Sequence, residues 1–357
     1  MKRILGTGAA LAAAMGMAAT ASAQFHPDVI YGQDTRVDLY QVTDPKLLAL
    51  ADSTIALFQA SDVTSSGGVS TLSTRPYGES YGLCKEEPFY EQGSGAFCSG
   101  SLVAPDVIMT AGHCVPSADE CAGIKFVFGF DVKKAGVQPT SVPDGEVYGC
   151  KELIGREQNN TGADWALVRL DRKVAGHQPV KLNLGGAIVN GAPVMVIGHP
   201  AGLPTKIAGG AHVRDASPNG YFVANLDTYG GNSGSAVFNE STGLVEGILV
   251  RGEQDFVQKG ECRVSNVCPV DGCRGEDVTK IANVAAKIPV AEERALIWEI
   301  YERKYFGAVG DPAQRPTDSG WTGAEIKECV RKASRLRISL KDRIPPGPSA
   351  PDRYFAV

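Results

Sequence analysis

Three short stretches of this 357-residue chain carry residue types that together support nucleophilic chemistry. His113 lies in Thr-Ala-Gly-His-Cys, Asp164 opens the run Asp-Trp-Ala-Leu, and Ser233 lies in Gly-Gly-Asn-Ser-Gly-Ser. A serine hydroxyl is a weak nucleophile at neutral pH, and a neutral imidazole can take its proton and later return it to a leaving group. A carboxylate that accepts from the other ring nitrogen fixes the tautomer that this transfer needs. We therefore predict acyl-transfer chemistry from Ser233, His113 and Asp164.

The setting of His113 separates it from the other four histidines, which have no matching partner motif. Residues 97–103 and 107–110 predict a hairpin that turns at Pro105 and Asp106. Such a hairpin brings Cys98 and Cys114 within bridging distance. We expect a disulfide between them that holds the turn bearing His113.

Glycines surround Ser233, so the backbone there can bend sharply and approach a substrate carbonyl. We expect the N–H groups of Gly231 and Ser233 to form an oxyanion hole. Asp164 stands at the start of an apolar run over 165–170, where a strand would hold its side chain.

From residue 54 to about 288, short strand-like runs alternate with Gly, Pro, Asn and Asp. This pattern predicts an all-β sandwich or barrel. Helical spacing is found at 46–51 and, late in the chain, at 278–286 and 292–305. After Phe306 the chain becomes rich in proline and glycine.

Residues 1–23 have the basic start, apolar run and Ala-Ser-Ala end of a signal peptide, so we expect export to the periplasm or the medium. A net charge of −5 and no later apolar run of spanning length argue against nucleic acid and membrane partners. We expect a monomer. Nine cysteines in an exported chain predict disulfides with one thiol left over. The spacing of Cys262, Cys268 and Cys273 does not fit a zinc site, and we expect no metal and no cofactor.

The motifs around His113, Asp164 and Ser233 resemble those of the chymotrypsin/trypsin family of serine peptidases, and most of all its bacterial branch with the secreted glutamyl endopeptidases. The resemblance implies two six-stranded antiparallel β-barrels with the active site between them, plus C-terminal helices. It also implies a secreted serine endopeptidase that cleaves protein or peptide substrates through an acyl-enzyme. We expect a peptidase domain at 53–288, a prosegment or extension at 24–52, and a helical, Pro-rich extension at 289–357.

The chain departs from this family in two places. Trypsin-like enzymes have Asp just before the nucleophile, where it pairs with a new amino terminus; Asn232 stands here, so we expect activation without that ion pair. Asp227, six residues before Ser233, implies a pocket for Arg or Lys before the cut, while Leu249 replaces the His that glutamyl endopeptidases use. Arg251 could instead neutralise Asp227, or Asp227 could simply cap a turn.

We considered two other functions for this sequence. A catalytically silent, protease-like binding protein would usually have lost one of the three residues, and all three are present. An α/β-hydrolase esterase would have Ser before Asp before His, which is the reverse of the order here.

Overall fold

Six antiparallel strands close the first barrel in the order β10, β12, β13, β9, β8, β3. The computed structural model describes residues 29–289 and, beyond them, residues 301–302, 304–306, 327 and 329–331. The strands of this barrel are β3 (Thr54–Gln59), β8 (Cys98–Ala104), β9 (Val107–Thr110), β10 (Ile124–Val127), β12 (Val147–Gln158) and β13 (Asp164–Leu170).

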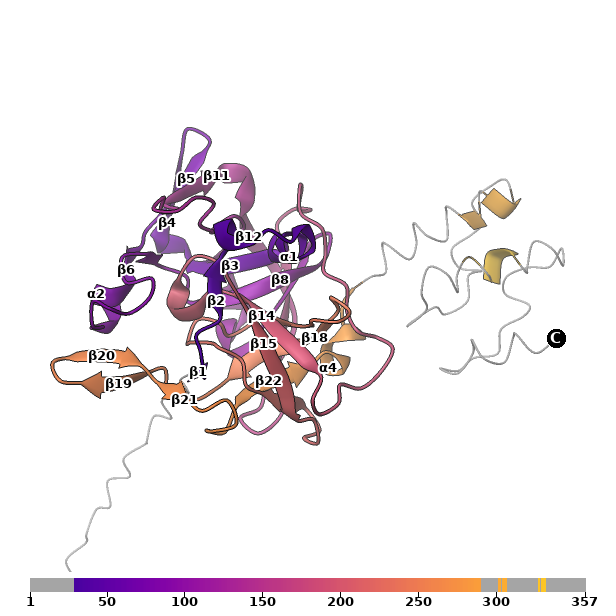
Figure 1. The fold of residues 1–357 in the computed structure, drawn as a ribbon. Coiled ribbons are helices and arrows are strands. Elements are labelled where there is room, and N and C mark those ends of the chain that lie inside the picture. Colours follow the sequence, from indigo (N-terminus) through magenta and orange to yellow (C-terminus); the bar gives the residue numbers. More distant parts are fainter. Residues whose placement is uncertain (1–28, 290–300, 303, 307–326, 328, 332–357) are drawn as a thin grey trace, which may run out of the picture.

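A second barrel follows in the chain, with the order β14, β17, β18, β22, β16, β15, and the pairing of β14 with β15 closes it. Its strands are β14 (Pro193–Gly198), β15 (Lys206–Asp215), β16 (Tyr221–Ala224), β17 (Ala236–Asn239), β18 (Val245–Arg251) and β22 (Glu276–Lys280). The short strand β2 (Arg36–Asp38) adds to the outer edge of β15. Figure 1 shows the two barrels packed together. The predicted fold of two six-stranded barrels is confirmed.

The strands where the barrels meet are buried on both faces. All seven residues of β8 are buried, and so are six of the seven in β13. The largest apolar cluster joins Leu102 and Leu167 of the first barrel to Ile197 and Ile248 of the second. Complete burial of such a side chain contributes about 1.5–3 kcal/mol, so the junction between the barrels is a rigid base for side chains at its edge.

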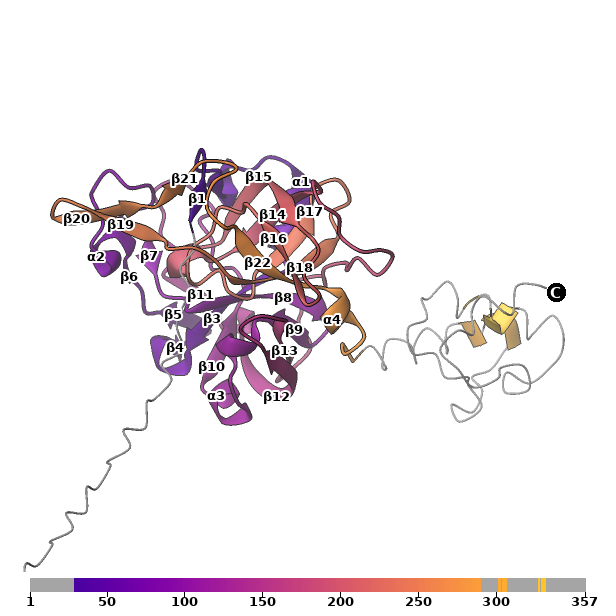
Figure 2. The same ribbon diagram turned by 90° about the horizontal axis from the view of Figure 1, so that it is seen from below.

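Smaller elements surround the barrels. They are β1 (Ile30–Tyr31) paired with β21 (Val267–Cys268), β4 (Val63–Ser66) with β5 (Val69–Leu72) and β11 (Ser141–Pro143), β6 (Arg75–Pro76) with β7 (Gly93–Ser94), β19 (Phe256–Lys259) with β20 (Cys262–Ser265), and the helices α1 (Pro45–Ala51), α2 (Tyr77–Tyr81) and α3 (Ala118–Ala122). Both views show the β19–β20 hairpin projecting beside α2 (Figures 1 and 2).

Four disulfides link the described residues: Cys84–Cys262, Cys98–Cys114, Cys121–Cys150 and Cys268–Cys273. Cys329 is the cysteine that stays outside these pairs.

The helix expected at 278–286 begins later than predicted. Residues up to Lys280 belong to β22, because they pair with β18 and β16, and only α4 (Ala282–Ala285) is helical. The helix expected at 292–305 lies mostly outside the described residues, as do the expected signal peptide and most of the C-terminal extension. No helix among the described residues is both long and apolar enough to span a membrane.

Candidate active site

His113 lies in a tight turn, Gly112–Cys114, directly after β9. A Cβ atom on Gly112 would lie 2.1 Å from the carbonyl oxygen of Glu157, so only glycine allows this approach. On the other side of His113, the disulfide of Cys114 with Cys98 ties the turn to β8. The imidazole is therefore held from both sides of the chain.

Asp164 opens β13 and is 3% exposed. Its Oδ1 accepts from the N–H groups of Gly112 at 2.6 Å and His113 at 3.2 Å, and its Oδ2 lies 2.8 Å from Nδ1 of His113. Because a carboxylate only accepts, the proton of the neutral imidazole lies on Nδ1 and leaves Nε2 as an acceptor. The Thr279 hydroxyl bridges the N–H and the carbonyl of Asp164, both at 2.9 Å.

The turn that bears Ser233 packs against the first barrel. Gly231 and Gly234 both have φ of +93°, which favours glycine, and a Cβ on Gly234 would lie 2.0 Å from the carbonyl oxygen of Ser99. The N–H of Ser99 donates to the carbonyl of Ser233 at 2.8 Å, and Sγ of Cys114 lies 3.6 Å from that same oxygen. Ser233 therefore lies beside the disulfide that follows His113.

The Ser233 hydroxyl makes no hydrogen bond with the His113 imidazole among the described residues. Catalytic hydrogen bonds of this kind are often long without substrate and tighten in the complex. His113 and Asp164 are thus in direct contact, whereas Ser233 adjoins them through its backbone.

Two peptide groups in the Ser233 turn have carbonyls that accept hydrogen bonds. The carbonyl of Gly230 accepts from the N–H of Ala201 at 2.6 Å, and that of Asn232 accepts from the N–H of Ser235 at 2.8 Å. In a planar trans peptide the N–H points away from the carbonyl. The N–H groups of Gly231 and Ser233 are therefore turned away from these partners.

Sequence reasoning missed Ser99, which no motif marks. Its hydroxyl donates to the carbonyl of Gly231 at 2.8 Å and accepts from the N–H of His199 at 2.9 Å. The carbonyl of Ser99 also accepts from the hydroxyl of Thr110 at 2.6 Å. One serine of β8 thus links the Ser233 turn to the loop after β14.

The residues expected to line a specificity pocket have other contacts. Asp227 is 4% exposed and accepts from the backbone of Tyr31 and from Thr35. Leu249 is 1% exposed in the core of the second barrel. Arg251 donates to Asp277 and to two carbonyls of the loop before β13, not to Asp227. Each of these three side chains thus has contacts within the fold, and their role as a substrate-binding set stays a prediction.

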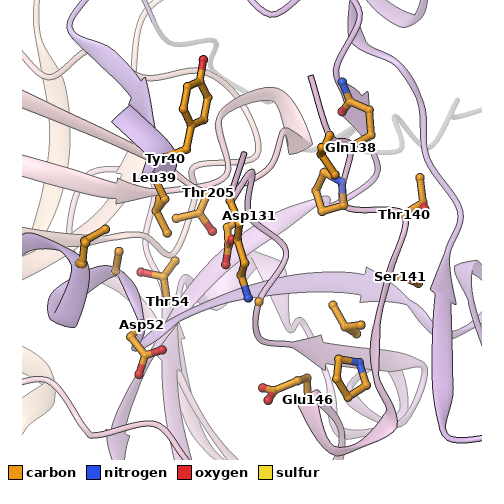
Figure 3. A pocket seen from close by; sticks show the side chains of 18 of the residues that line it. Leu39, Tyr40, Asp52, Thr54, Asp131, Gln138, Thr140, Ser141, Glu146 and Thr205 are labelled. Carbon is orange, nitrogen blue, oxygen red and sulfur yellow. The ribbon is translucent and has the colours of Figure 1, made fainter. Parts of the chain in front are cut away.

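A cavity of about 410 Å³ lies beside His113, and its walls include Phe97, Pro116, Ile124 and Glu120. A larger cavity of about 610 Å³ lies elsewhere, at the edge of the first barrel (Figure 3). Its labelled residues include Asp52, Asp131 and Glu146, and it contains none of the three candidate catalytic residues. Of these two cavities, the smaller is the one that is lined by a candidate catalytic residue, His113.

One group of side chains, Cys98, Cys114 and His113, has ligand atoms within 4.8 Å of one another, as a metal site would. The two sulfurs are joined as a disulfide and are not thiolates, so they are unsuited to bind a metal.

Residues 98–248 match the model of the trypsin-like peptidase domain family. The glutamyl endopeptidase of Bacillus licheniformis is 28% identical over 156 residues, which are 41% of this chain and 46% of that protein. The human chymotrypsin-like elastase family member 3B is 31% identical over 116 residues, which are 30% of this chain and 42% of that protein.

A solved structure of a Glu endopeptidase aligns with 74% of this chain and 100% of its own, at 17% identity and a TM-score of 0.41. The chain spans less than half the length of the curated relatives it matches.

Proposed function

We propose that this protein is an exported serine endopeptidase that cleaves peptide bonds through an acyl-enzyme. Ser233 attacks the carbonyl carbon, Nε2 of His113 takes the hydroxyl proton and gives it to the leaving amine, and water then hydrolyses the ester. Asp164 orients the imidazole and stabilises its protonated form. The observation that carries the proposal is the contact of the Asp164 carboxylate with Nδ1 of His113 and with the backbone of the same turn.

The N–H groups of Gly231 and Ser233 would bind the oxygen of the tetrahedral intermediate. Their orientation away from the engaged carbonyls supports this role. A donor that is fixed before the reaction is typically worth about 2.7–4 kcal/mol of barrier. The role fails if these N–H groups do not approach a bound boronate or phosphonate oxygen in a crystal structure.

We also propose a preference for Arg or Lys before the cut, on the basis of an acidic residue other than the one that the sequence suggested. The Asp255 carboxylate is partly exposed and accepts from the N–H of Gly230 at 3.2 and 3.3 Å. An acid close to the segment before Ser233 favours a cationic substrate side chain. Cleavage profiling on a peptide library should show this preference, and Asp255→Asn should weaken it. An unchanged profile would remove the assignment.

Export is supported by four disulfides, since such bonds persist in oxidising compartments. We propose proteins or peptides as the substrates, because the related proteins are an endopeptidase and a member of an elastase family.

A fluorophosphonate probe that reacts with activated serines tests the enzyme directly. The oxidised wild-type chain should be labelled, and Ser233→Ala should lose both the label and turnover, the latter by roughly 10⁶-fold. Ser241→Ala, at an exposed serine, is the matched control and should behave as wild type. Absence of labelling in correctly disulfide-bonded protein would favour a catalytically silent binding protein.

A further inference from the structure

Residues 29–38, here called the N-terminal clamp, lie along the segment that leads to Ser233. The clamp enters as β1, which pairs in parallel with β21, and leaves as β2, which pairs with β15. The carbonyl of Val29 accepts from the N–H of Thr228 at 3.3 Å. The clamp is therefore paired with β21 at one end and with β15 of the second barrel at the other, and it contacts the segment 227–233 between them.

Asp227 is the centre of this contact. Its Oδ1 accepts from the N–H of Tyr31 at 2.7 Å, and its Oδ2 accepts from the N–H and the hydroxyl of Thr35 at 2.9 and 2.7 Å. Hydrogen bonds to a charged group are stronger than those between neutral groups. Three of them converge on one side chain six residues before Ser233.

Arg36 contacts the same segment through a stacking interaction. Its guanidinium stacks on the ring of Tyr229, 4.1 Å from the ring centroid, and its Nε and Nη2 donate to the two oxygens of Asp34. The Arg36 side chain is 1% exposed. The carbonyl of Tyr229 accepts from the N–H of Asn232 at 2.9 Å, so the ring that Arg36 contacts belongs to the Ser233 turn.

The residue before the nucleophile does not supply an ionic anchor of its own. Asn232 is uncharged and 2% exposed, and its Oδ1 accepts from the hydroxyl of Ser235 at 3.1 Å. Charged groups link the 227–233 segment to the clamp instead: the Asp227 carboxylate accepts from the clamp, and the Arg36 guanidinium stacks on Tyr229. A buried ion pair such as Arg36 with Asp34 adds little to stability, and structural specificity is one reason to retain it.

We propose that the N-terminal clamp is a permanent part of the catalytic unit, in which Asp227 and Arg36 are positioning residues that fix the N–H groups of Gly231 and Ser233 for catalysis. This inference rests on the proposed function. It assigns to Asp227 a role in the transition state, not in recognition of the residue before the cut.

Substitutions in the full oxidised chain test the clamp. Asp227→Asn and Arg36→Met should lower kcat on ester and amide substrates by about 10- to 100-fold, since misplaced oxyanion donors act on the transition state. KM should change less than about threefold, whereas the affinity for a peptide boronic acid, which forms a tetrahedral adduct, should fall in parallel with kcat. Arg36→Lys should recover only part of the loss, because Lys lacks the flat guanidinium.

Thr35→Val is the milder variant, removes one hydrogen bond to Asp227, and should lower kcat by about tenfold. Asp44→Asn, at the exposed cap of α1 in the same extension, should leave kcat unchanged. An unchanged kcat and boronate affinity in the clamp variants, with only a lower melting temperature, would overturn the positioning role. A loss confined to substrates with Arg or Lys would also overturn it and return Asp227 to the pocket. In both of these outcomes the clamp variants still react with the fluorophosphonate probe, so the proposed function stands while the positioning role fails. An unlabelled and inactive wild type would instead contradict the proposed function and the role of the clamp together.

Discussion

Ser99 is a residue whose role in the site comes from four contacts and no motif. Its N–H, carbonyl and hydroxyl contact Ser233, Thr110, Gly231 and His199. The hydroxyl is buried and donates to the peptide that precedes the Ser233 turn. Loss of this donor leaves a carbonyl and an N–H without their partner, which costs more than a surface hydrogen bond.

Ser99→Ala should therefore lower kcat by about 10- to 100-fold with a small effect on KM, because release of the Gly231 carbonyl loosens the turn that carries the proposed oxyanion N–H groups. Steady-state kinetics on one peptide ester measure the split. Ser101→Ala is a matched control, since Ser101 is buried in the same strand two residues away. Equal losses in both variants would point to packing of β8 and not to the hydroxyl of Ser99.

The three catalytic candidates were predictable because each lies in a local motif with its glycine or strand start. The contacts of Asp227 were not, because Tyr31 and Thr35 are 196 and 192 residues away in the chain. A sequence pattern identifies residue types that are close together in the chain. It does not show which residues of a distant segment will contact them in the folded protein. The pattern around Asp227 therefore did not indicate that its carboxylate contacts the clamp.

At the scale of elements, the loop after β14 carries a buried histidine. His199 is 1% exposed, and its Nδ1 lies 3.0 Å from the carbonyl of Leu203, so Nδ1 carries the proton of a neutral ring. Burial, together with the nearby charge of Lys206, lowers the pKa of His199 from 6.5 to about 4. The folded protein thus holds this histidine neutral at a pH where the unfolded chain protonates it.

The free energy of unfolding should consequently fall as the pH drops from about 6.5 to about 4, by up to about 1.4 kcal/mol per pH unit from this group. The sign follows because the unfolded state binds more protons in this window. Burial raises the pKa of Asp131 to about 6, which acts in the opposite direction between 3.8 and that value. The contribution of His199 is therefore the difference between wild type and His199→Asn in urea titrations at several pH values.

His199→Asn should flatten the pH dependence of the free energy of unfolding between about pH 4 and 6.5. Parallel curves for His199→Asn would show that the ring is protonated in the folded state.

The elements themselves were largely predictable. The expected strands at 97–103, 107–110 and 165–170 correspond to β8, β9 and β13 within a residue at each end, because apolar runs between turn residues define them. Closure of the second barrel by β14 with β15, and the place of β2 beside it, depend on tertiary pairing. The helix expected at 278–286 failed at its start because a strand partner overrode helical spacing.

At the scale of the whole molecule, the Cys84–Cys262 disulfide joins an insertion of the first barrel to the β19–β20 hairpin of the second across 178 residues. Tyr77, Tyr229 and Phe256 pack together where these parts meet. This contact lies on the same side of the Ser233 segment as the N-terminal clamp, whose Arg36 stacks on Tyr229. The disulfide-linked aromatic cluster and the N-terminal clamp thus both contact the segment that leads to Ser233.

The double variant Cys84→Ser with Cys262→Ser should lower the free energy of unfolding by about 4 kcal/mol, because the bond restricts a long loop of the unfolded chain. Removal of Cys268–Cys273, which closes a separation of 5 residues, should cost about half as much. Denaturant titrations of the two double variants compare the values. Equal losses would contradict an account based on loop closure.

The disulfide between Cys98 and Cys114 has a consequence for when the proposed peptidase acquires activity. The bond lies directly after His113 and also adjoins the carbonyl of Ser233. On the proposed route of export, a newly made chain in the reducing cytoplasm would lack this bond, and its histidine would lie on a turn that is fixed on one side only. Oxidation after export would complete the site, so the cell that makes the proposed peptidase would contain only an incompletely assembled form.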